Sequence, residues 1–134
     1  GLMEALGVRP RFVGRNELDY LVVVDTEGEV RSLAPDLRAL AAISTRGVMV
    51  TARSAGEHDF VSRFFAPGAG IDEDPVTGSA HCCLGPYWAG VLGRDELVGY
   101  QASARGGVVR VSVNGERVLL YGPAVTVLRG EIVA

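Results

Sequence analysis

Residues 71–85, IDEDPVTGSAHCCLG, concentrate side chains that can bind anions or move protons. Carboxylates occupy positions 72–74, and hydroxyls follow at Thr77 and Ser79. Gly78 allows another group to approach the backbone closely, and a helix N-terminus offers unpaired N–H donors with a positive partial charge. If a helix begins here, the pattern predicts a pocket that binds a small carboxylic acid beside a proton carrier.

The same residues also have a simpler interpretation as helix caps. Asp, Thr and Ser side chains commonly accept hydrogen bonds from first-turn amides, and Asp74 followed by Pro75 is a common helix start. Thr77 or Ser79 could cap the helix instead, which would leave residues 74–76 in the preceding loop. A cap needs one oxygen, whereas this segment offers several. The pattern therefore favours a site but leaves the capping alternative open.

The helix that must position these residues is expected to end at Gly93, a natural stop. Residues 79–93 are small and apolar on nearly every side, as expected for a helix enclosed by a sheet. Pro86 should kink this helix or end its first segment near Gly85. Three large apolar residues spaced by four should share the side that faces the core: Leu84, Trp88 and Leu92.

Short β-strands, about seven or eight in all, are expected around this helix. Asn114–Gly115 lies between two β-rich runs and predicts a hairpin with a type I′ turn. Neither side of residues 60–65 is plainly polar, which predicts a central strand. Short helices are expected at residues 1–7 and 34–43. Strands are predicted within residues 11–25 (two, around a turn at 14–16), 47–54, 59–66, 108–122 and 124–133.

Composition narrows the classes of function. The 134 residues predict a single domain. All 13 positively charged residues are arginines, so no lysine can form a Schiff base with a carbonyl substrate or with pyridoxal phosphate. The net charge of -3 and the scattered arginines predict no nucleic-acid partner. No apolar run reaches the roughly 18 residues of a membrane span, and no signal sequence is evident, so a cytoplasmic protein without a membrane partner is expected.

Other reactive side chains are given minor roles. His81 lies two residues beyond Ser79, on a different side of the helix, and is expected to pack or form a hydrogen bond in the interior; His58 is expected on the surface. Consecutive helical residues point about 100° apart, so His81, Cys82 and Cys83 cannot close on one zinc ion, and the cysteines are expected to be buried core residues. A serine hydrolase is disfavoured because Ser79 lacks the Gly-x-Ser-x-Gly pattern.

The segment DEDPVTGSAH closely resembles the signature of the PhzF-like (phenazine biosynthesis) isomerase family, which shares its fold with diaminopimelate epimerase. The resemblance continues through FVSRFFAPGAGIDEDPVTGSAHCCLGPYW and covers nearly the whole chain, from about Leu2 through GPAVTVLRGEI. It implies an α+β fold in which a mostly antiparallel, barrel-like sheet wraps around one central helix. It also implies cofactor-independent and metal-independent proton transfer on a small carboxylic acid, as in isomerisation of a dihydro-hydroxyanthranilate.

The resemblance assigns roles to the motif residues. Asp74 matches the aspartate that assists proton transfer. Ser79 matches the motif serine, whose hydroxyl group and the backbone amides of Gly78 and Ser79 hold the substrate carboxylate. Thr77, at the same helix start, is included among the carboxylate-binding residues.

A complete member of that family is about twice as long and carries its principal acid/base glutamate, with a histidine, in a first domain. No residue here matches that glutamate, so residues 1–134 resemble the C-terminal half of a two-domain enzyme. The chain alone is expected to be inactive, to pair with the missing N-terminal domain, and to self-associate through exposed apolar surface. The alternative is a non-catalytic carboxylate-binding or dimerisation domain with the same fold.

Overall fold

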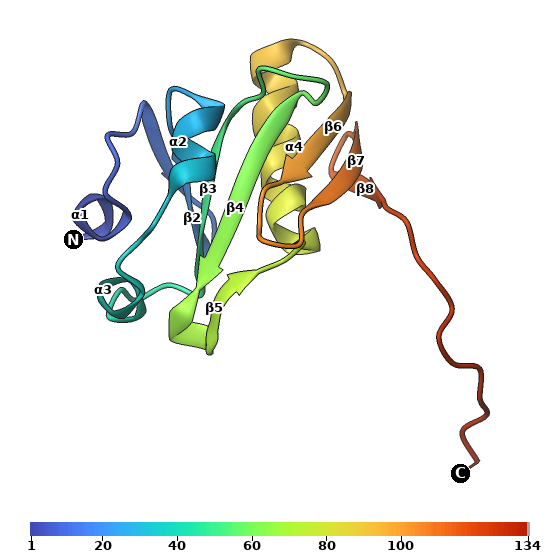
Figure 1. Cartoon of the computed structure of the whole chain (residues 1–134). Helices are drawn as coiled ribbons and strands as arrows, with labels where there is room; N and C mark the ends of the chain where they lie inside the picture. The colour runs from blue at the N-terminus through green and yellow to red at the C-terminus, as the bar shows by residue number, and fades with distance from the viewer. Residues whose placement is uncertain (134) are drawn as a thin grey trace.

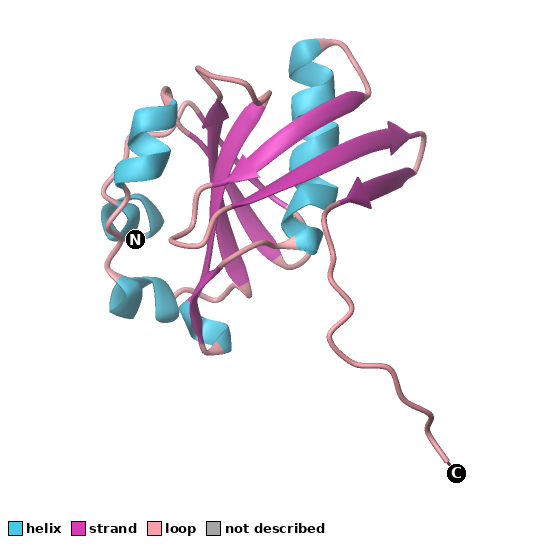
Figure 2. Cartoon of the chain, turned by 45° about the vertical axis from the view of Figure 1, so that its right-hand side comes forward, coloured by secondary structure: helices cyan, strands magenta, loops and turns pink. Residues whose placement is uncertain are grey.

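Residues 1–133, the part of the chain described by the computed structural model, form a mixed β-sheet with helices on both faces (Figure 1, Figure 2). The elements are, in chain order, α1 (Leu2–Leu6), β1 (Phe12–Arg15), β2 (Asp19–Val23), α2 (Glu27–Ser32), α3 (Leu37–Ala41), β3 (Gly47–Arg53), β4 (Phe60–Ala66), the 3-10 helix η1 (Pro67–Ala69), β5 (Ile71–Asp74), α4 (Gly78–Leu92), β6 (Glu96–Gln101), β7 (Gly107–Asn114) and β8 (Arg117–Tyr121). The strand order is β1-β2-β3-β4-β6-β7-β8, and β5 pairs with β4. The β2–β3 and β4–β6 pairs are parallel, and the other pairs are antiparallel.

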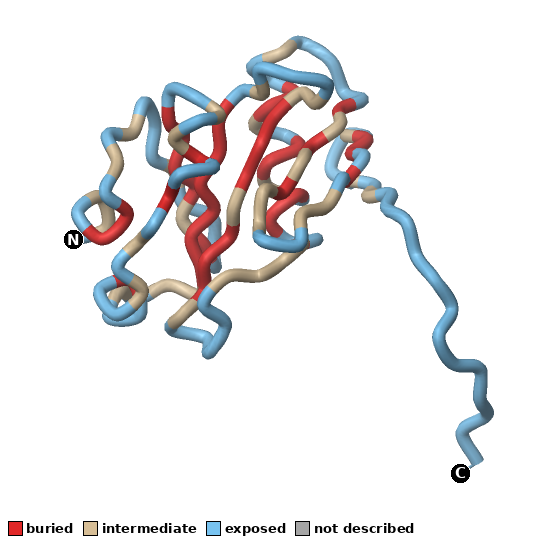
Figure 3. The backbone as a smooth tube through the Cα atoms, viewed as in Figure 1, coloured by how far each residue is buried: buried red, intermediate tan, exposed pale blue. Residues whose placement is uncertain are grey.

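Each face of the sheet buries its own apolar core, because side chains alternate between the two faces along a strand. On one face, α4 packs with side chains such as Leu21 and Met49. On the other face, α1, α2 and α3 pack with the neighbouring side chains Val22 and Val50. Figure 3 shows the buried backbone running through the central strands and α4. Residues 60–65 belong to a strand covered on both faces, so the predicted central strand is confirmed.

The sheet curls around α4, and strands from β2 to β8 contribute to the core that surrounds this helix. The predicted α+β fold, a mostly antiparallel sheet around one central helix, is confirmed. Leu84 and Trp88 are buried and Leu92 packs at the edge of the core, as their spacing predicted. Of the two outcomes expected at Pro86, the end of a first helical segment near Gly85 is wrong, because α4 continues through Pro86. Pro86 is exposed, so water can bond the carbonyl that loses its helical partner.

Two glycines allow phenylalanine rings to lie across neighbouring strands on the side that faces α4. Gly99 pairs with Phe60, and a Cβ atom at position 99 would lie 2.5 Å from the Cζ atom of Phe60. A Cβ atom at Gly47 would lie 2.3 Å from the Cζ atom of Phe64. Each ring therefore fills the space that a side chain on the neighbouring strand would need.

The hairpin between β7 and β8 is confirmed, but its turn type differs from the prediction. Asn114 pairs with Arg117, so Gly115 and Glu116 form the two-residue loop. Of these two loop residues, only Gly115 has a positive φ angle, 58°, which is typical of a type II′ turn rather than type I′. The helices predicted near residues 1–7 and 34–43 are present as α1 and α3. The prediction did not include α2, β5 or β6, all of which are short.

The strand predicted at residues 124–133 is wrong, because residues 122–133 form no helix or strand. In Figure 1 this segment runs away from the sheet, and apolar side chains such as Val127 and Ile132 are 92% and 100% exposed. An alternating apolar pattern indicates that one side of a segment could pack on a core. A strand also needs a neighbouring strand whose backbone groups it can bond, and the pattern does not supply one. None of the helices within residues 1–133 has the length and apolar character needed to cross a bilayer.

Candidate functional site

The predicted site residues lie where β5 leads into α4. Asp74 is the last residue of β5, and Thr77 is the N-cap residue of α4, with extended backbone angles. Of the three expected caps, Asp74, Thr77 and Ser79, the helix follows Thr77, and residues 74–76 precede it. Gly78 and Ser79 are exposed, Asp74 is half-buried, and Thr77 is only 7% exposed. The tip of α4, defined here as residues 77–79, is open to solvent at Gly78 and Ser79.

The capping alternative is wrong for these side chains. Although Thr77 occupies the N-cap position, its side chain accepts no hydrogen bond from the helix. Its hydroxyl group instead donates to Oδ2 of Asp74 at 2.6 Å. The Ser79 hydroxyl accepts from Arg46, with Nη2 and Oγ 3.1 Å apart. Within residues 1–133, no side chain accepts from the backbone amides of Gly78 and Ser79.

A buried glutamine on β6 fixes the turn that carries Asp74. Gln101 is fully buried; its Oε1 accepts from the Thr77 amide at 2.8 Å, and its Nε2 donates to the Asp74 carbonyl at 2.7 Å. Nε2 also donates to Oγ1 of Thr77 at 3.0 Å. An amide nitrogen can only donate, so the Thr77 hydroxyl uses its own hydrogen for Asp74. Ser103 adds a hydrogen bond to the Pro75 carbonyl at 2.7 Å.

Sequence analysis did not identify Gln101, although a signal was present. In β6 every second residue is buried, and Gln101 occupies one of these positions after Leu97 and Gly99. A polar side chain at an inward-facing strand position needs hydrogen-bonding partners inside the protein. The alternation along the strand could therefore have identified Gln101.

Arg46 and Asp19 reach the tip of α4 from other parts of the chain. Arg46 lies just before β3 and pairs with Asp19, the first residue of β2, which is fully buried. Nε of Arg46 donates to Oδ1 of Asp19 at 2.9 Å, and Nη2 donates to Oδ2. The hydrogen bond to Asp19 raises the pKa of Arg46. Sequence analysis identified neither residue, because they lie 27 positions apart and 33 or more from Ser79.

His81 points into the core, as predicted, and takes no part in the exposed tip. It is fully buried, its Nδ1 lies 2.8 Å from the Thr77 carbonyl oxygen, and its ring packs near Phe60. Its Nε2 has no hydrogen-bond partner in the described chain. Burial lowers the pKa of His81 and so favours the neutral form of the ring. His58 is half-buried, stacked on the Tyr100 ring.

The prediction that both cysteines are buried in the core is wrong. Cys82 is exposed and Cys83 is half-buried, because consecutive helical residues point in different directions and the sheet covers only part of α4. Burial raises the pKa of the Cys83 thiol. The described residues contain no group of three or more His, Cys, Asp or Glu side chains arranged to hold a metal ion.

A cavity of about 580 Å³ borders the tip of α4. Val76 and Gly78 line it from the motif, Val108 and Leu120 line it from β7 and β8, and Arg105 adds a positive charge. Apolar side chains therefore line this cavity beside Gly78. A ligand whose carboxylate bonds the tip would have space here for an apolar body.

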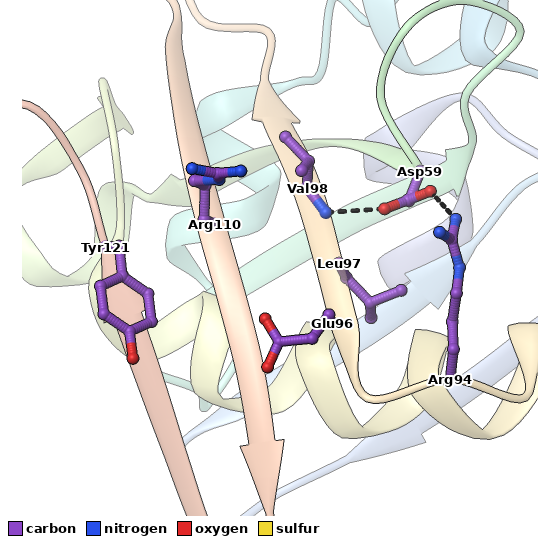
Figure 4. Close-up of a pocket in the computed structure, with 7 residues that line it drawn as sticks. All are labelled: Asp59, Arg94, Glu96, Leu97, Val98, Arg110 and Tyr121. Carbon is purple, nitrogen blue, oxygen red and sulfur yellow. Dashed lines mark hydrogen bonds and ion pairs between the residues drawn. The ribbon is translucent and has the colours of Figure 1, made fainter.

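A second cavity, of about 420 Å³, lies beside β6, β7 and β8 and contains none of the predicted site residues (Figure 4). Its Asp59 carboxylate pairs with Arg94 and accepts from the Val98 amide at 2.7 Å, as Figure 4 shows. This carboxylate is engaged in holding the strand and helix ends together. The open donors beside the motif distinguish the tip of α4 from this cavity.

Residues 8–130 match the family model described as phenazine biosynthesis-like protein, PhzC-PhzF. The chain belongs to this family. The match covers the motif, the turn held by Gln101, and both Asp19 and Arg46.

The curated relatives described here are about twice as long as this chain or longer. An uncharacterized isomerase of Halalkalibacterium halodurans is 51% identical over 132 residues, covering 98% of this chain and 50% of the relative. A human phenazine biosynthesis-like domain-containing protein is 38% identical over 117 residues, covering 87% of this chain and 37% of the relative. The chain thus spans about half, or less, of the length of the curated relatives it matches.

Solved structures of the family have the same fold. A PhzF-family protein of Enterococcus faecalis superimposes with a TM-score of 0.85 at 40% identity, covering 89% of this chain and 45% of that one. A phenazine biosynthesis PhzC/PhzF protein of Clostridium difficile gives a TM-score of 0.84 at 36% identity, covering 94% and 48%. Both superpositions show that this chain has the fold of PhzF-family proteins.

Proposed function

We propose that this chain is the C-terminal half of a PhzF-like isomerase that moves a proton on a small carboxylic acid, with the substrate carboxylate at the tip of α4. The observation that carries the proposal is the pair of exposed residues Gly78 and Ser79, whose backbone amides bond no described side chain, beside an Asp74 carboxylate held in a fixed orientation. The names of the bacterial relatives, which include the word isomerase, support the reaction class.

The tip of α4 supplies the groups that a carboxylate needs. First-turn amides of a helix donate hydrogen bonds to anions, and the helix dipole favours negative charge at this end. The Ser79 hydroxyl accepts from Arg46, so its own hydrogen is available for an anionic oxygen. α4 has 15 residues, long enough for its backbone dipoles to align over several turns.

Asp74 is arranged to exchange a proton beside such a ligand. Its Oδ2 accepts from Thr77, while its Oδ1 makes no hydrogen bond within residues 1–133. One oxygen therefore fixes the carboxylate, and the other can accept or deliver a proton. In the proposed enzyme Asp74 assists proton transfer, and the principal acid/base comes from an N-terminal half. The reaction needs only acid–base groups, so we propose that it is cofactor-independent.

Because the principal acid/base is proposed to come from an N-terminal half, turnover should require that half. A single wall cannot position a substrate fully or exclude water from it. We therefore expect this chain to bind carboxylates weakly and to incorporate no deuterium from D₂O into dihydro-hydroxyanthranilate, as followed by NMR. Rapid deuterium incorporation by this chain alone would refute the proposal that turnover needs the N-terminal half. Self-association remains a separate prediction, testable by sedimentation.

The binding site is tested by titrating the ¹⁵N-labelled chain with benzoate and following its amide signals. Benzamide, which has the same shape without the charge, serves as the ligand control. We expect the signals of Gly78 and Ser79 to shift with benzoate, and we expect Ser79→Ala to weaken the binding. Ser44→Ala, on an exposed loop residue, is the matched control. Equal binding by wild type and Ser79→Ala would contradict the proposed site.

Asp74→Asn separates proton transfer from binding. Asparagine keeps the shape of the side chain and can still accept from Thr77, so benzoate binding should change little. When the chain is combined with the N-terminal half, the variant should lose most of its deuterium incorporation. Binding without turnover in the combined wild-type protein would favour the alternative, a non-catalytic carboxylate-binding domain.

A further inference from the structure

The ion pair between Arg46 and Asp19 differs from an ordinary surface ion pair in its burial and in its two hydrogen bonds. The Asp19 side chain is 1% exposed, whereas that of Arg46 is 37% exposed. Two nitrogens of Arg46 bond the two oxygens of Asp19, which fixes the plane of the guanidinium. A buried carboxylate without its partner is strongly unfavourable, so Arg46 is held in place.

The geometry points to Arg46 as a carboxylate-binding residue of the tip of α4, with Asp19 as its positioning residue; this inference rests on the proposed function. Nη2 of Arg46 lies 3.1 Å from the Ser79 hydroxyl oxygen, so the guanidinium reaches the tip. Its Nη1 makes no hydrogen bond to the chain within residues 1–133, and the side chain is partly exposed. A charged donor is therefore available beside the open amides.

Arg46 also determines what Ser79 can do. Guanidinium nitrogens only donate, so Oγ of Ser79 is the acceptor and its hydrogen is directed elsewhere. Asp19 lies behind the guanidinium, which makes the pair a dipole with its positive end toward the tip. The Cζ atom of Arg46 lies 6.0 Å from the centre of the Phe64 ring, and this packing further limits its movement.

The ligand that fits these donors is a planar monocarboxylate. One oxygen would accept from Nη1 of Arg46, and the other would accept from the Ser79 hydroxyl and the first-turn amides of α4. Lysine would keep the charge but not the fork that bonds Asp19 and Ser79 together. The inference therefore predicts a dependence on the guanidinium group as well as on charge.

The test uses benzoate titrations of the ¹⁵N-labelled chain with variants at this pair. Arg46→Gln alone would leave the buried Asp19 unpaired, so the main variant is the neutral double substitution Asp19→Asn/Arg46→Gln, whose amide groups can still bond each other. We expect this variant to bind benzoate about tenfold more weakly, the loss of one charged hydrogen bond. Arg46→Lys should lie between wild type and the double variant. Arg38→Gln, on an exposed arginine of α3, should bind like wild type.

The outcomes separate this inference from the proposed function. If the folded double variant binds benzoate as tightly as wild type while Ser79→Ala binds weakly, the carboxylate site stands and the role of Arg46 is overturned. If wild type does not bind benzoate, or if neither substitution matters, both proposals fail. Retention of the dispersed amide spectrum shows that each variant is folded. Full affinity in Arg46→Lys would show that charge alone suffices and would overturn the role of the fork.

Discussion

Two helices of this chain have threonine at the N-cap position, and the two threonines are used differently. At the start of α2, Oγ1 of Thr26 accepts from the Glu29 amide at 3.2 Å, and Oε2 of Glu29 accepts from the Thr26 amide at 2.9 Å. At the start of α4, the Thr77 hydroxyl turns back to Asp74 and is held there by Gln101. At α2 the threonine side chain accepts from a first-turn amide of its own helix, whereas at α4 it does not.

The residue three positions after each threonine explains the difference. In α2 it is Glu29, a partly exposed acid that completes a capping box. In α4 it is Ala80, which is 1% exposed against the core, where an acidic side chain could not be accommodated. The Thr77 amide therefore lacks a capping-box partner and bonds Oε1 of Gln101 instead, and the hydrogen bonds from Gln101 and Ser103 to the Asp74 and Pro75 carbonyls stabilise the turn from outside the helix. An open helix end is stable here because another strand fixes it.

The largest effect is expected from Gln101→Leu, which removes the group that holds the open end. The Thr77 amide and the Asp74 carbonyl would lose their partners in a buried setting. We expect the free energy of unfolding to fall by about 3 kcal/mol, measured by urea denaturation, with benzoate binding also weakened. Ser103→Ala, which removes only the contact to Pro75, should cost less. A Gln101→Leu protein as stable as wild type would show that the turn holds without this residue.

A matched pair of substitutions at the two threonines tests the comparison directly. Thr77→Val removes a buried hydroxyl and frees Asp74, so we expect a loss of about 2 kcal/mol in urea denaturation and weaker benzoate binding. Thr26→Val removes an ordinary cap, with an expected loss of about 1 kcal/mol and unchanged benzoate binding. Equal effects of the two variants on benzoate affinity would remove the distinction between the helix ends.

The smallest effect is expected from the protonation of His81, beneath the tip of α4. Burial lowers its pKa, so the unfolded chain, with an ordinary value of about 6.5, binds a proton at a higher pH than the folded chain. Stability should be greatest above that value and decline as the pH falls below it toward the folded pKa. Thermal unfolding at pH 7.5 and pH 5.5 measures the decline.

His81→Asn is the control for this decline, because its amide can replace Nδ1 without titrating. The variant should show a flatter pH dependence than wild type over the same interval. Glu27, whose pKa is lowered mainly by a hydrogen bond from the Ala55 amide, loses its contribution only as the pH falls below its usual value near 4.5. A decline of equal size in His81→Asn would assign it to other groups.

The sequence was most informative where function depends on neighbouring residues. Asp74, Thr77, Gly78 and Ser79 lie within six positions, and the structure has all four where β5 leads into α4. Their hydrogen bonds could not be predicted, because capping and non-capping arrangements use the same residue types. The choice depends on Gln101, a partner that pairing of β6 in the sheet brings into place.

The features that were not predicted from the sequence all depend on contacts with residues far away along the chain. Arg46 and Asp19 meet because β2 and β3 pair in parallel, with Asp19 opposite Gly47, a register that local pattern does not reveal. Residues 124–133 alternate like a strand but have no neighbouring strand in the described chain. Cys82 is apolar enough for a core but lies on the uncovered side of α4. The local pattern predicts whether a segment is a helix or a strand, whereas the pairing of strands in the sheet determines which residues it contacts.

The contact between Phe60 and Gly99 restricts how this sheet can vary. Because the ring occupies the space of the missing side chain, even alanine at position 99 would collide with it unless Phe60 also became smaller. A larger residue at position 99 therefore requires a smaller side chain at position 60, although 38 residues separate them along the chain. Among natural variants, a larger residue at position 99 should therefore be accompanied by a smaller side chain at position 60.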